Sequence, residues 1–501
     1  MDPRGSAAGL EDLPESVLID GVWRGAWDGH TMEVAGPLSS ARLARAGQRD
    51  AQDAVRAARL AFDKGPWPRM SGRERAQILY DAADLIDGDG GRLAWLQAVE
   101  MGKPIRFGER DDVPFATMAL RFFAAMASQQ ARGAGATPSV GRVALREPRG
   151  VIGALCAFHH PLAMAAAIVA PALAMGDTVV LKPPMAAARS LVEFARLCQE
   201  AGMPPGALNV VTGGRELGCA LAASPGVDLV SFLGSVPQGR EIATACAGQF
   251  VPTDLDLGLP NAHLVFEDAC VEHAARLVAR SLLPGRAEFR ASGVRILVHE
   301  RVYEEFLDRL QSHVAEQAPG DPRDPRTRLG PLAGVEQLGG LQAFLARALA
   351  AGARRLPLDD APSASAPGCA GIAPELLVAA HLLEVPTAAA AAVVDVPDVL
   401  APLALLTSFR ETAEAIDVLN LGSGTQTCGL YTADIARAGA VAEALCTGMC
   451  RIDACRSDAD ACRAMDEDDQ VEDEGLPLRE FGIDSARPFT REKAVWVDVL
   501  C

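Results

Sequence analysis

Hydrophobic and polar residues follow a helical period near the start of the chain and form short strand-like runs further on. Residues 50–62 and 73–86 carry apolar positions three and four apart, which predicts two amphipathic helices that open the protein. Predicted strands at 150–155, 178–184, 207–214 and 227–235 then alternate with predicted helices at 161–176, 190–202 and from about 237. This alternation is typical of a doubly wound parallel sheet.

After a polar break near 252–262 the alternation resumes and predicts a second α/β lobe. A strand is predicted at 295–300 and helices at 302–314 and 338–353, and the pattern continues to about 433. Residues 455–476 are strongly acidic and lack apolar periodicity, so we expect an exposed loop there. The run KAVWVDVL at 493–500 predicts a terminal strand, and such a strand often pairs with a neighbouring subunit through its free edge.

Composition narrows the class of protein. The 501 residues are 49% hydrophobic and 22% charged, which is ordinary for a globular protein of more than one domain. The net charge of −18 argues against nucleic acid and anionic membranes as partners. The most apolar stretch, 162–175, is too short to cross a membrane, and the acidic start lacks the features of a secretion signal. We therefore expect a cytoplasmic protein with reduced thiols.

Four cysteines near the end of the second lobe, Cys446, Cys450, Cys455 and Cys462, raise the question of a zinc site. Structural zinc sites usually contain paired cysteines two residues apart, and this cluster has no such pair. The spacing therefore favours free thiols, and we expect no metal site.

Several longer segments carry a family resemblance. They are EMGKP (100–104), EPRGVIGALCAFHHPLAM (147–164), APALAMGDTVVLKPP (170–184), SFLGSVPQGREI (231–242), SGVRILVHERVYEEFL (292–307) and FTREKAVWV (489–497). In this order the segments resemble the NAD(P)-dependent aldehyde dehydrogenase superfamily, and the likeness extends from residue 18 to residue 499. No single segment is specific enough to carry the resemblance alone.

The resemblance implies an α/β fold of the aldehyde-dehydrogenase type, with two doubly wound α/β domains and a small β oligomerisation element. A Rossmann-like cofactor domain would comprise 1–124 and 148–257, and a catalytic-type domain 258–476. The oligomerisation element would comprise 125–147 and 487–501. Members of the family usually assemble as dimers or tetramers, so the resemblance also implies an oligomer.

The reacting positions depart from the family pattern. Members use a cysteine thiolate as nucleophile, a glutamate as base and an asparagine that holds the oxyanion. Counted from the family's motifs, the cysteine aligns with Arg290, the glutamate with Asp256, 34 residues earlier, and the asparagine with His159. A guanidinium stays protonated and cannot act as the nucleophile. Asp256 is one methylene shorter than glutamate, whereas a histidine at 159 can still donate a hydrogen bond.

The cofactor positions are partly kept. Lys182 matches the lysine that bonds the adenosine ribose, but Met185 stands in place of its acidic companion. The remaining matches are Gly234 and Ser235 at the phosphate-facing turn, Phe158 in place of a tryptophan, Leu155 as a hydrophobic wall, and Asp398 in place of the glutamate that anchors the nicotinamide ribose. The resemblance thus implies that NAD or NADP binds weakly or not at all.

These substitutions favour an aldehyde dehydrogenase homologue without catalysis, a pseudoenzyme that serves as a structural or regulatory subunit. Its oligomer would contain copies of itself or an active aldehyde dehydrogenase. One alternative is an NAD(P)-dependent oxidoreductase of aldehydes that uses another thiol, such as Cys455. Another is a cleft enzyme of a different kind that uses Arg290, His159 and Asp256. The sequence leaves these alternatives open.

Overall fold

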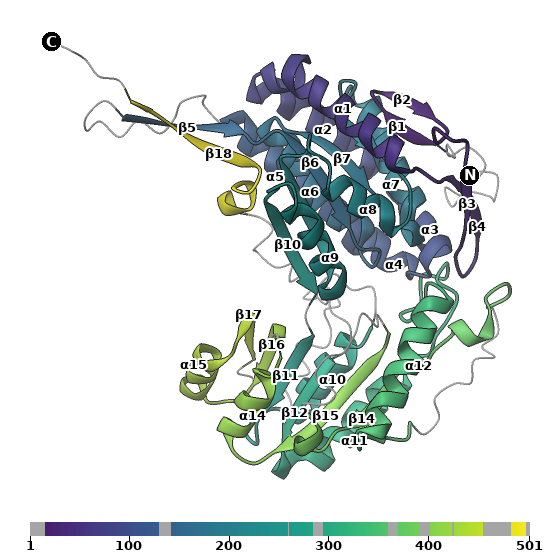
Figure 1. Ribbon diagram of the computed structural model, residues 1–501. Helices are drawn as coiled ribbons and strands as arrows, with labels where there is room; N and C mark the ends of the chain where they lie inside the picture. The colour runs from purple at the N-terminus through teal and green to yellow at the C-terminus, as the bar shows by residue number, and fades with distance from the viewer. Residues whose placement is uncertain are drawn as a thin grey trace. The chain divides into compact units, whose positions relative to one another are not determined.

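The chain is organised as two units that each contain one large sheet (Figure 1). The computed structural model describes residues 16–129, 142–258, 260–283, 294–358, 369–390, 401–422, 425–453 and 482–496. Residues 1–100, 107–257 and 476–501 make up the first unit, and residues 101–106 and 258–475 the second. No helix in the described parts of the chain is both long enough and apolar enough to span a membrane.

The first unit is built on a seven-stranded sheet. In order across it lie β10 (Thr253–Gly258), β9 (Leu229–Ser235), β6 (Val151–Cys156), β7 (Thr178–Lys182), β8 (Leu208–Val210), β1 (Val17–Ile19) and β2 (Val22–Arg24). The pairs β6–β7, β6–β9 and β7–β8 are parallel, while β1 runs antiparallel to β8 and β2. The predicted doubly wound arrangement is therefore confirmed, with two added antiparallel strands.

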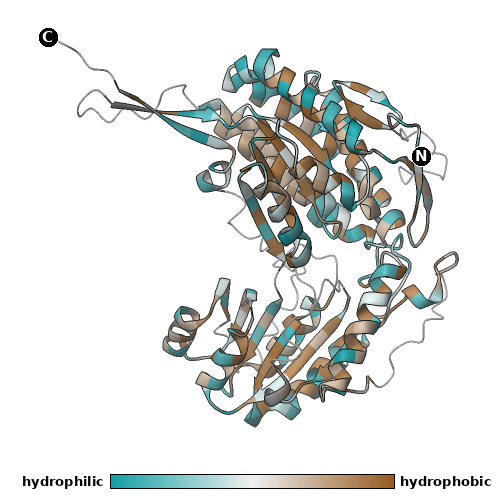
Figure 2. Cartoon of the chain, in the orientation of Figure 1, coloured by the Kyte–Doolittle hydropathy of each residue, from teal (hydrophilic) through white to brown (hydrophobic). Residues whose placement is uncertain are grey.

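Helices cover both faces of this sheet because each central strand is apolar on both sides. The face that includes Ile152 and Ala154 packs against α2 (Gly72–Gly88), α5 (Val113–Gln129), α6 (Pro161–Met175) and α7 (Ala188–Glu200). The opposite face, with Val151 and Leu155, packs against α1 (Gln48–Lys64), α8 (Arg215–Ala222) and α9 (Val236–Ala247). Figure 2 shows the resulting concentration of hydrophobic residues in the strands.

Two predictions for this unit were wrong. The two opening helices are preceded by β1, β2 and an antiparallel hairpin of β3 (Thr31–Ala35) and β4 (Ser40–Ala44). The polar break near 252–262 contains β10 and the start of the next strand. β10 alternates acidic and apolar residues: Leu255 and Leu257 pack on the core, and Asp254 accepts a hydrogen bond from the Ser231 hydroxyl at 3.0 Å. An edge strand tolerates this pattern because its outer side is open to solvent.

A separate two-stranded ribbon belongs to the same unit. β5 (Arg142–Pro148) and β18 (Thr490–Trp496) pair antiparallel, with Ala144 opposite Ala494. The Lys493 ammonium lies 2.9 Å from the Glu147 carboxylate across the ribbon. Figure 1 shows the ribbon extending away from the helices of its unit. The predicted terminal strand is confirmed over 493–496, and residues 497–500 lie outside the described residues.

The second unit repeats the α/β plan. Its sheet runs β13 (Arg354–Arg355), β14 (His381–Glu384), β15 (Leu403–Phe409), β12 (Val294–His299), β11 (Asn261–Val265), β16 (Thr425–Tyr431) and β17 (Thr447–Asp453). One face packs against α10 (Val271–Ser281) and α11 (Tyr303–Ala315). The other packs against α12 (Val335–Ala350), α14 (Thr412–Leu419) and α15 (Ile435–Ala444). The predicted second lobe is confirmed, and the predicted acidic loop at 455–476 lies outside the described residues.

A buried carboxyl group in the first unit binds the first turn of α7. Glu100, near the end of α3 (Gly90–Met101), accepts hydrogen bonds from the backbone N–H groups of Arg189 at 2.9 Å and Ser190 at 3.2 Å. These N–H groups belong to the first turn of α7, where a helix has unsatisfied donors. Burial raises the pKa of Glu100 to about 7, although the Arg189 guanidinium and these N–H groups act in the opposite direction.

This raised pKa predicts a stability that declines with pH. Because the folded protein holds the proton of Glu100 more tightly than the unfolded chain, its stabilising effect is complete below pH 4.5 and is lost as the pH rises to about 7. A shift of this size corresponds to about 3 kcal/mol in the free energy of unfolding. We expect Glu100→Gln to reduce the difference in that free energy between pH 5 and pH 8 by roughly this amount, as measured by urea unfolding.

The control is Glu33→Gln, which changes an exposed carboxylate on β3 in the same unit. This variant should keep the pH dependence of the unaltered protein. The same pH dependence in Glu100→Gln would show that Glu100 is not the group responsible.

Candidate functional site

The order of the strands locates a binding crevice in the first unit. The chain passes from β6 to β7 and β8 on one side, then returns to β9 and β10 on the other side of β6. In open parallel sheets, ligands bind outside the carboxyl ends of the strands at the point where the direction of winding reverses. Here that point lies between β6, which ends at Cys156, and β9, which ends at Ser235.

Three aromatic rings follow β6. Phe158 is half-buried, while His159 and His160 are buried, and α6 begins directly after them. The ring centroids of Phe158 and His159 lie 6.3 Å apart and those of His159 and His160 5.3 Å apart, both with edge-to-face geometry. Leu155, one of the predicted cofactor contacts, is buried among the residues that pack against α1, α8 and α9. Packing therefore fixes the ring of His159 at the carboxyl end of β6.

A buried ion pair lies behind these rings. The Asp112 carboxylate approaches the Nδ1 atom of His160 to 2.9 Å, and the two side chains are 0% and 3% exposed. Asp112 ends a π-helical turn, Gly108–Asp112, that leads into α5. Because both side chains are buried at this distance, the contact with Asp112 restrains the orientation of the His160 ring.

The sequence did not predict the role of Asp112. The two partners lie 48 positions apart in the chain, so local pattern does not connect them. One signal was available: Asp112 lies in helical register with Phe115, Ala116 and Ala119 on the buried face of α5. A carboxylate on such a face needs a partner, because burying an unpaired charge is costly.

The turn at the end of β9 forms the N-terminus of α9. The Ser235 hydroxyl accepts a hydrogen bond from the backbone N–H of Gln238 at 3.3 Å, and the first turn of the helix contains no acidic residue. Glycine at 234 is required by packing, because a Cβ atom there would lie 2.5 Å from the ring of Phe232. The helix dipole and the N–H groups at this end favour an anionic ligand.

Lys182 is the last residue of β7 and lies opposite Leu155 of β6. Its Nζ atom donates a hydrogen bond to the carbonyl oxygen of Pro183 at 3.2 Å. The cation at this strand end and the N-terminus of α9 suit the ribose hydroxyls and the pyrophosphate of a dinucleotide, so these residues fit NAD or NADP. Met185 follows on the next turn and offers no carboxylate for such hydroxyls.

The other residues predicted from the sequence do not lie at these strand ends in the described structure. Asp256 is half-buried on β10, at the edge of the same sheet. Arg290 and Asp398 lie outside the described residues, as do Cys455 and Cys462. The structure thus brings Leu155, Phe158, His159, Lys182, Gly234 and Ser235 to the carboxyl ends of adjacent strands of one sheet.

Six of the described thiols are poorly suited to act as nucleophiles. Burial raises the pKa of Cys156 and of Cys198 to about 12 and that of Cys246 to about 11. Burial also raises the pKa of Cys369, Cys428 and Cys450. A raised pKa leaves little thiolate at neutral pH, and the thiolate is the reactive form. Among the described residues, no group of three or more histidine, cysteine or acidic side chains is placed to hold a metal ion.

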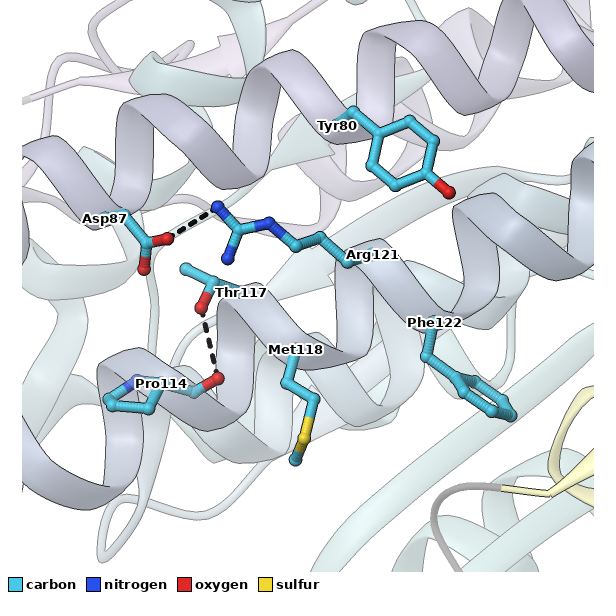
Figure 3. A pocket seen from close by; sticks show the side chains of 7 residues that line it. All are labelled: Tyr80, Asp87, Pro114, Thr117, Met118, Arg121 and Phe122. Carbon is cyan, nitrogen blue, oxygen red and sulfur yellow. Dashed lines mark hydrogen bonds and ion pairs between the residues drawn. The ribbon is translucent and has the colours of Figure 1, made fainter.

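A groove of about 680 Å³ lies elsewhere in the first unit, between α2 and α5 (Figure 3). Its lining residues are Tyr80, Asp87, Pro114, Thr117, Met118, Arg121 and Phe122. Arg121 spans the two helices, 2.6 Å from the carboxylate of Asp87 and 2.8 Å from that of Asp84. None of the residues predicted from the sequence lines this groove, so the strand ends remain the candidate site.

Comparisons with known proteins agree with this fold. The model of the aldehyde dehydrogenase family matches residues 23–462. The chain is 37% identical over 322 residues to aldehyde dehydrogenase 1 of Tanacetum cinerariifolium, a match that covers 63% of this chain and 64% of that protein. It is 37% identical over 333 residues to aldehyde dehydrogenase family 2 member C4 of Arabidopsis thaliana, covering 64% and 66%. The match thus spans just under two thirds of each of these relatives.

Among solved structures, the chain is similar to an indole-3-acetaldehyde dehydrogenase in complex with NAD+. The TM-score is 0.84 at 25% sequence identity, and the match covers 98% of this chain and 99% of the other. The α/β fold with two parallel-sheet units, predicted from the resemblance, is therefore confirmed.

The Asp112–His160 pair predicts a large effect of a small substitution. Asp112→Asn removes the buried charge while keeping the size of the side chain, so we expect the free energy of unfolding to fall by about 3 kcal/mol. The matched control is Asp84→Asn on α2, where the carboxylate is 72% exposed and pairs with Arg121. Its loss should cost less than about 1 kcal/mol. Equal effects in urea unfolding would contradict the assigned role of Asp112.

Proposed function

The chain belongs to the aldehyde dehydrogenase family, and from that premise we propose that it does not oxidise aldehydes through a thiolate. In this proposal it serves as a structural or regulatory subunit of an oligomer, built from its own copies or shared with an active aldehyde dehydrogenase. The observation that carries the proposal is the arginine at position 290, where the family's motifs place the nucleophilic cysteine. A guanidinium has no lone pair available for attack on a carbonyl carbon at working pH.

The surrounding groups support this proposal. A thiol elsewhere in the described chain would need a lowered pKa to replace the missing nucleophile, and every described thiol with a resolved shift has a raised one. Asp256, at the position of the family's base, is shorter than a glutamate by one methylene. His159, at the position of the oxyanion donor, can still donate a hydrogen bond. The changes concentrate at the reacting positions while the framework is kept.

Cofactor binding remains part of the proposal. Lys182 would hold the adenosine ribose and the N-terminus of α9 at Ser235 the pyrophosphate, with Leu155 and Phe158 as apolar neighbours. A bound NAD or NADP would supply a hydride acceptor. Because Met185 provides no carboxylate for the ribose, we expect weaker binding than in an active member. Asp398, the aligned nicotinamide-ribose contact, belongs to this proposal on sequence grounds alone.

The subunit role is supported by the ribbon of β5 and β18. A two-stranded sheet is marginally stable in water, and both of its outer edges carry unpaired backbone groups. A further strand or a covering surface from another subunit would satisfy these groups. We therefore propose 125–147 and 487–501 as the oligomerisation element, which contains both strands.

One observation favours a second candidate function. The buried Asp112–His160 pair holds an oriented imidazole beside His159, and such pairs occur in acid–base catalysis. A cleft enzyme with a different reaction, using His159, Asp256 and Arg290, would account for it. The subunit role is the better-supported function, because His159 and Asp256 lie on described parts of the first unit whereas Arg290 lies outside the described residues.

If the chain does not oxidise aldehydes, then NADH or NADPH should not form faster than in buffer without protein when NAD or NADP is supplied with a panel of aliphatic and aromatic aldehydes. An active aldehyde dehydrogenase in the same assay establishes that the conditions permit turnover. Cys455→Ala is measured alongside, since Cys455 is the leading substitute thiol. Sustained turnover that Cys455→Ala abolishes would overturn the proposal in favour of an active oxidoreductase.

The subunit role predicts a change of assembly when β18 is disrupted. Ala494 is exposed on β18 and lies opposite Ala144 of β5. Because proline removes a backbone donor from a strand, Ala494→Pro should convert the oligomer to monomers with little change in circular dichroism. Light scattering after size-exclusion chromatography measures the mass. Glu492→Ala, at another exposed position of β18, should keep the oligomer; an unchanged mass in Ala494→Pro would argue against this interface.

A further inference from the structure

The groove between α2 and α5 has two walls of different chemistry. On α5, the lining residues Pro114, Met118 and Phe122 lie four positions apart, so they project from one side of the helix on successive turns (Figure 3). On α2, Tyr80 and Asp87 line the groove. The α5 wall is therefore apolar, whereas the α2 wall carries polar and charged groups.

The apolar wall is open to solvent. Met118 is 46% exposed and Phe122 36%, although other sides of α5 are already buried in the core of the unit. The ring of Phe122 lies edge-to-face against that of Phe123, with the centroids 5.1 Å apart, and this contact restrains its position. Exposed methionine and ordered aromatic side chains are typical of surfaces that bind another protein.

The α2 wall is acidic. Asp81, Asp84 and Asp87 are exposed and lie three residues apart, so they share one half of the helix circumference. The guanidinium of Arg121 lies 2.8 Å from the Asp84 carboxylate and 2.6 Å from that of Asp87. Because one guanidinium faces three carboxylates, this wall keeps a net negative charge beside the apolar wall.

The length of the groove corresponds to about two turns of a helix. Tyr80 and Asp87 are seven residues apart on one wall, and Pro114 and Phe122 are eight apart on the other. At 1.5 Å per residue, either wall extends about 10–12 Å. The space between two packed helices accepts a third helix, because its side chains can interdigitate with both.

Charge determines which helix fits. A symmetric pair of copies of this chain would place the same patch against itself, so the acidic wall of one copy would lie close to that of the other. The net charge of −18 on each chain adds to this repulsion. A helix that carries positive charge avoids the repulsion and complements the α2 wall.

We propose that the groove between α2 and α5 binds a basic amphipathic helix of a partner protein. Apolar side chains three and four residues apart on that helix pack against Pro114, Met118 and Phe122, and flanking lysines or arginines pair with the carboxylates of the α2 wall. The interaction requires neither aldehyde oxidation nor a bound dinucleotide, and it does not involve the ribbon of β5 and β18.

The test is the binding of a fluorescent peptide to the full chain, measured by fluorescence anisotropy. The probe is a helix-forming peptide of about 16 residues, with leucines on one face and lysines on the other. The control peptide has glutamate in place of every lysine. The lysine peptide should bind at least about tenfold more tightly than the control, and added salt should weaken it. Equal affinities of the two peptides would overturn the proposal.

Variants of the protein assign the binding to the groove. Met118→Ser removes an apolar contact and Asp87→Lys reverses a charge, and each should weaken binding of the lysine peptide about tenfold. The matched controls are Leu60→Ser on α1, where the leucine is 52% exposed, and Glu304→Lys at an exposed position of α11. Both controls should keep the affinity of the unaltered protein. Losses of equal size in the controls would show that the peptide follows overall charge and hydrophobicity, contrary to the proposal.

Light scattering tests the alternative occupant, a second copy of the chain. Met118→Ser should keep the mass of the unaltered protein; a fall in mass that Leu60→Ser does not share would assign the groove to self-association and refute the proposal. Ala494→Pro changes only the ribbon and should still bind the lysine peptide. Failure of peptide binding leaves the proposed subunit role intact, because that role is tested by NADH formation and by the mass of Ala494→Pro. Circular dichroism checks that each variant is folded.

Discussion

The burial of β6 on both faces is the constraint on which the first unit depends. Every side chain from Val151 to Cys156 is buried, so helices must cover the sheet on each side. Parallel neighbours on both sides then require crossover connections, and the chain has to reverse its direction of winding at β6. The carboxyl ends of β6, β7 and β9 consequently meet at one edge. A ring cluster, an amine and a helix N-terminus reach that edge because of the sheet, without any local motif that specifies it.

Strong periodicity made most of this framework predictable. The helices predicted at 50–62 and 73–86 and the strand predicted at 150–155 lie within about two residues of α1, α2 and β6. β10 was missed because its acidic residues resemble a loop, and only its place at the sheet edge makes them acceptable. Asp112 was missed because its partner is distant in the chain.

The framework of a protein and the groups that react on it are separate properties. The fold of this chain matches that of aldehyde dehydrogenases, and the same framework stabilises the fold whether or not turnover occurs. In the proposed alignment with the family's motifs, a guanidinium and an imidazole stand at the positions of the sulfur and the amide. Fold similarity therefore establishes the α/β architecture, whereas the reaction that the chain can perform depends on the individual residues of the site.

The discontinuity of both units bears on how the protein is made. Residues 101–106 belong with a second unit whose remainder begins at 258, and β5 pairs with a strand more than three hundred residues further on. During synthesis, the whole second unit therefore leaves the ribosome before β18 is available to β5. A nascent chain cannot complete the ribbon, so any association through that element is delayed until translation has passed residue 490.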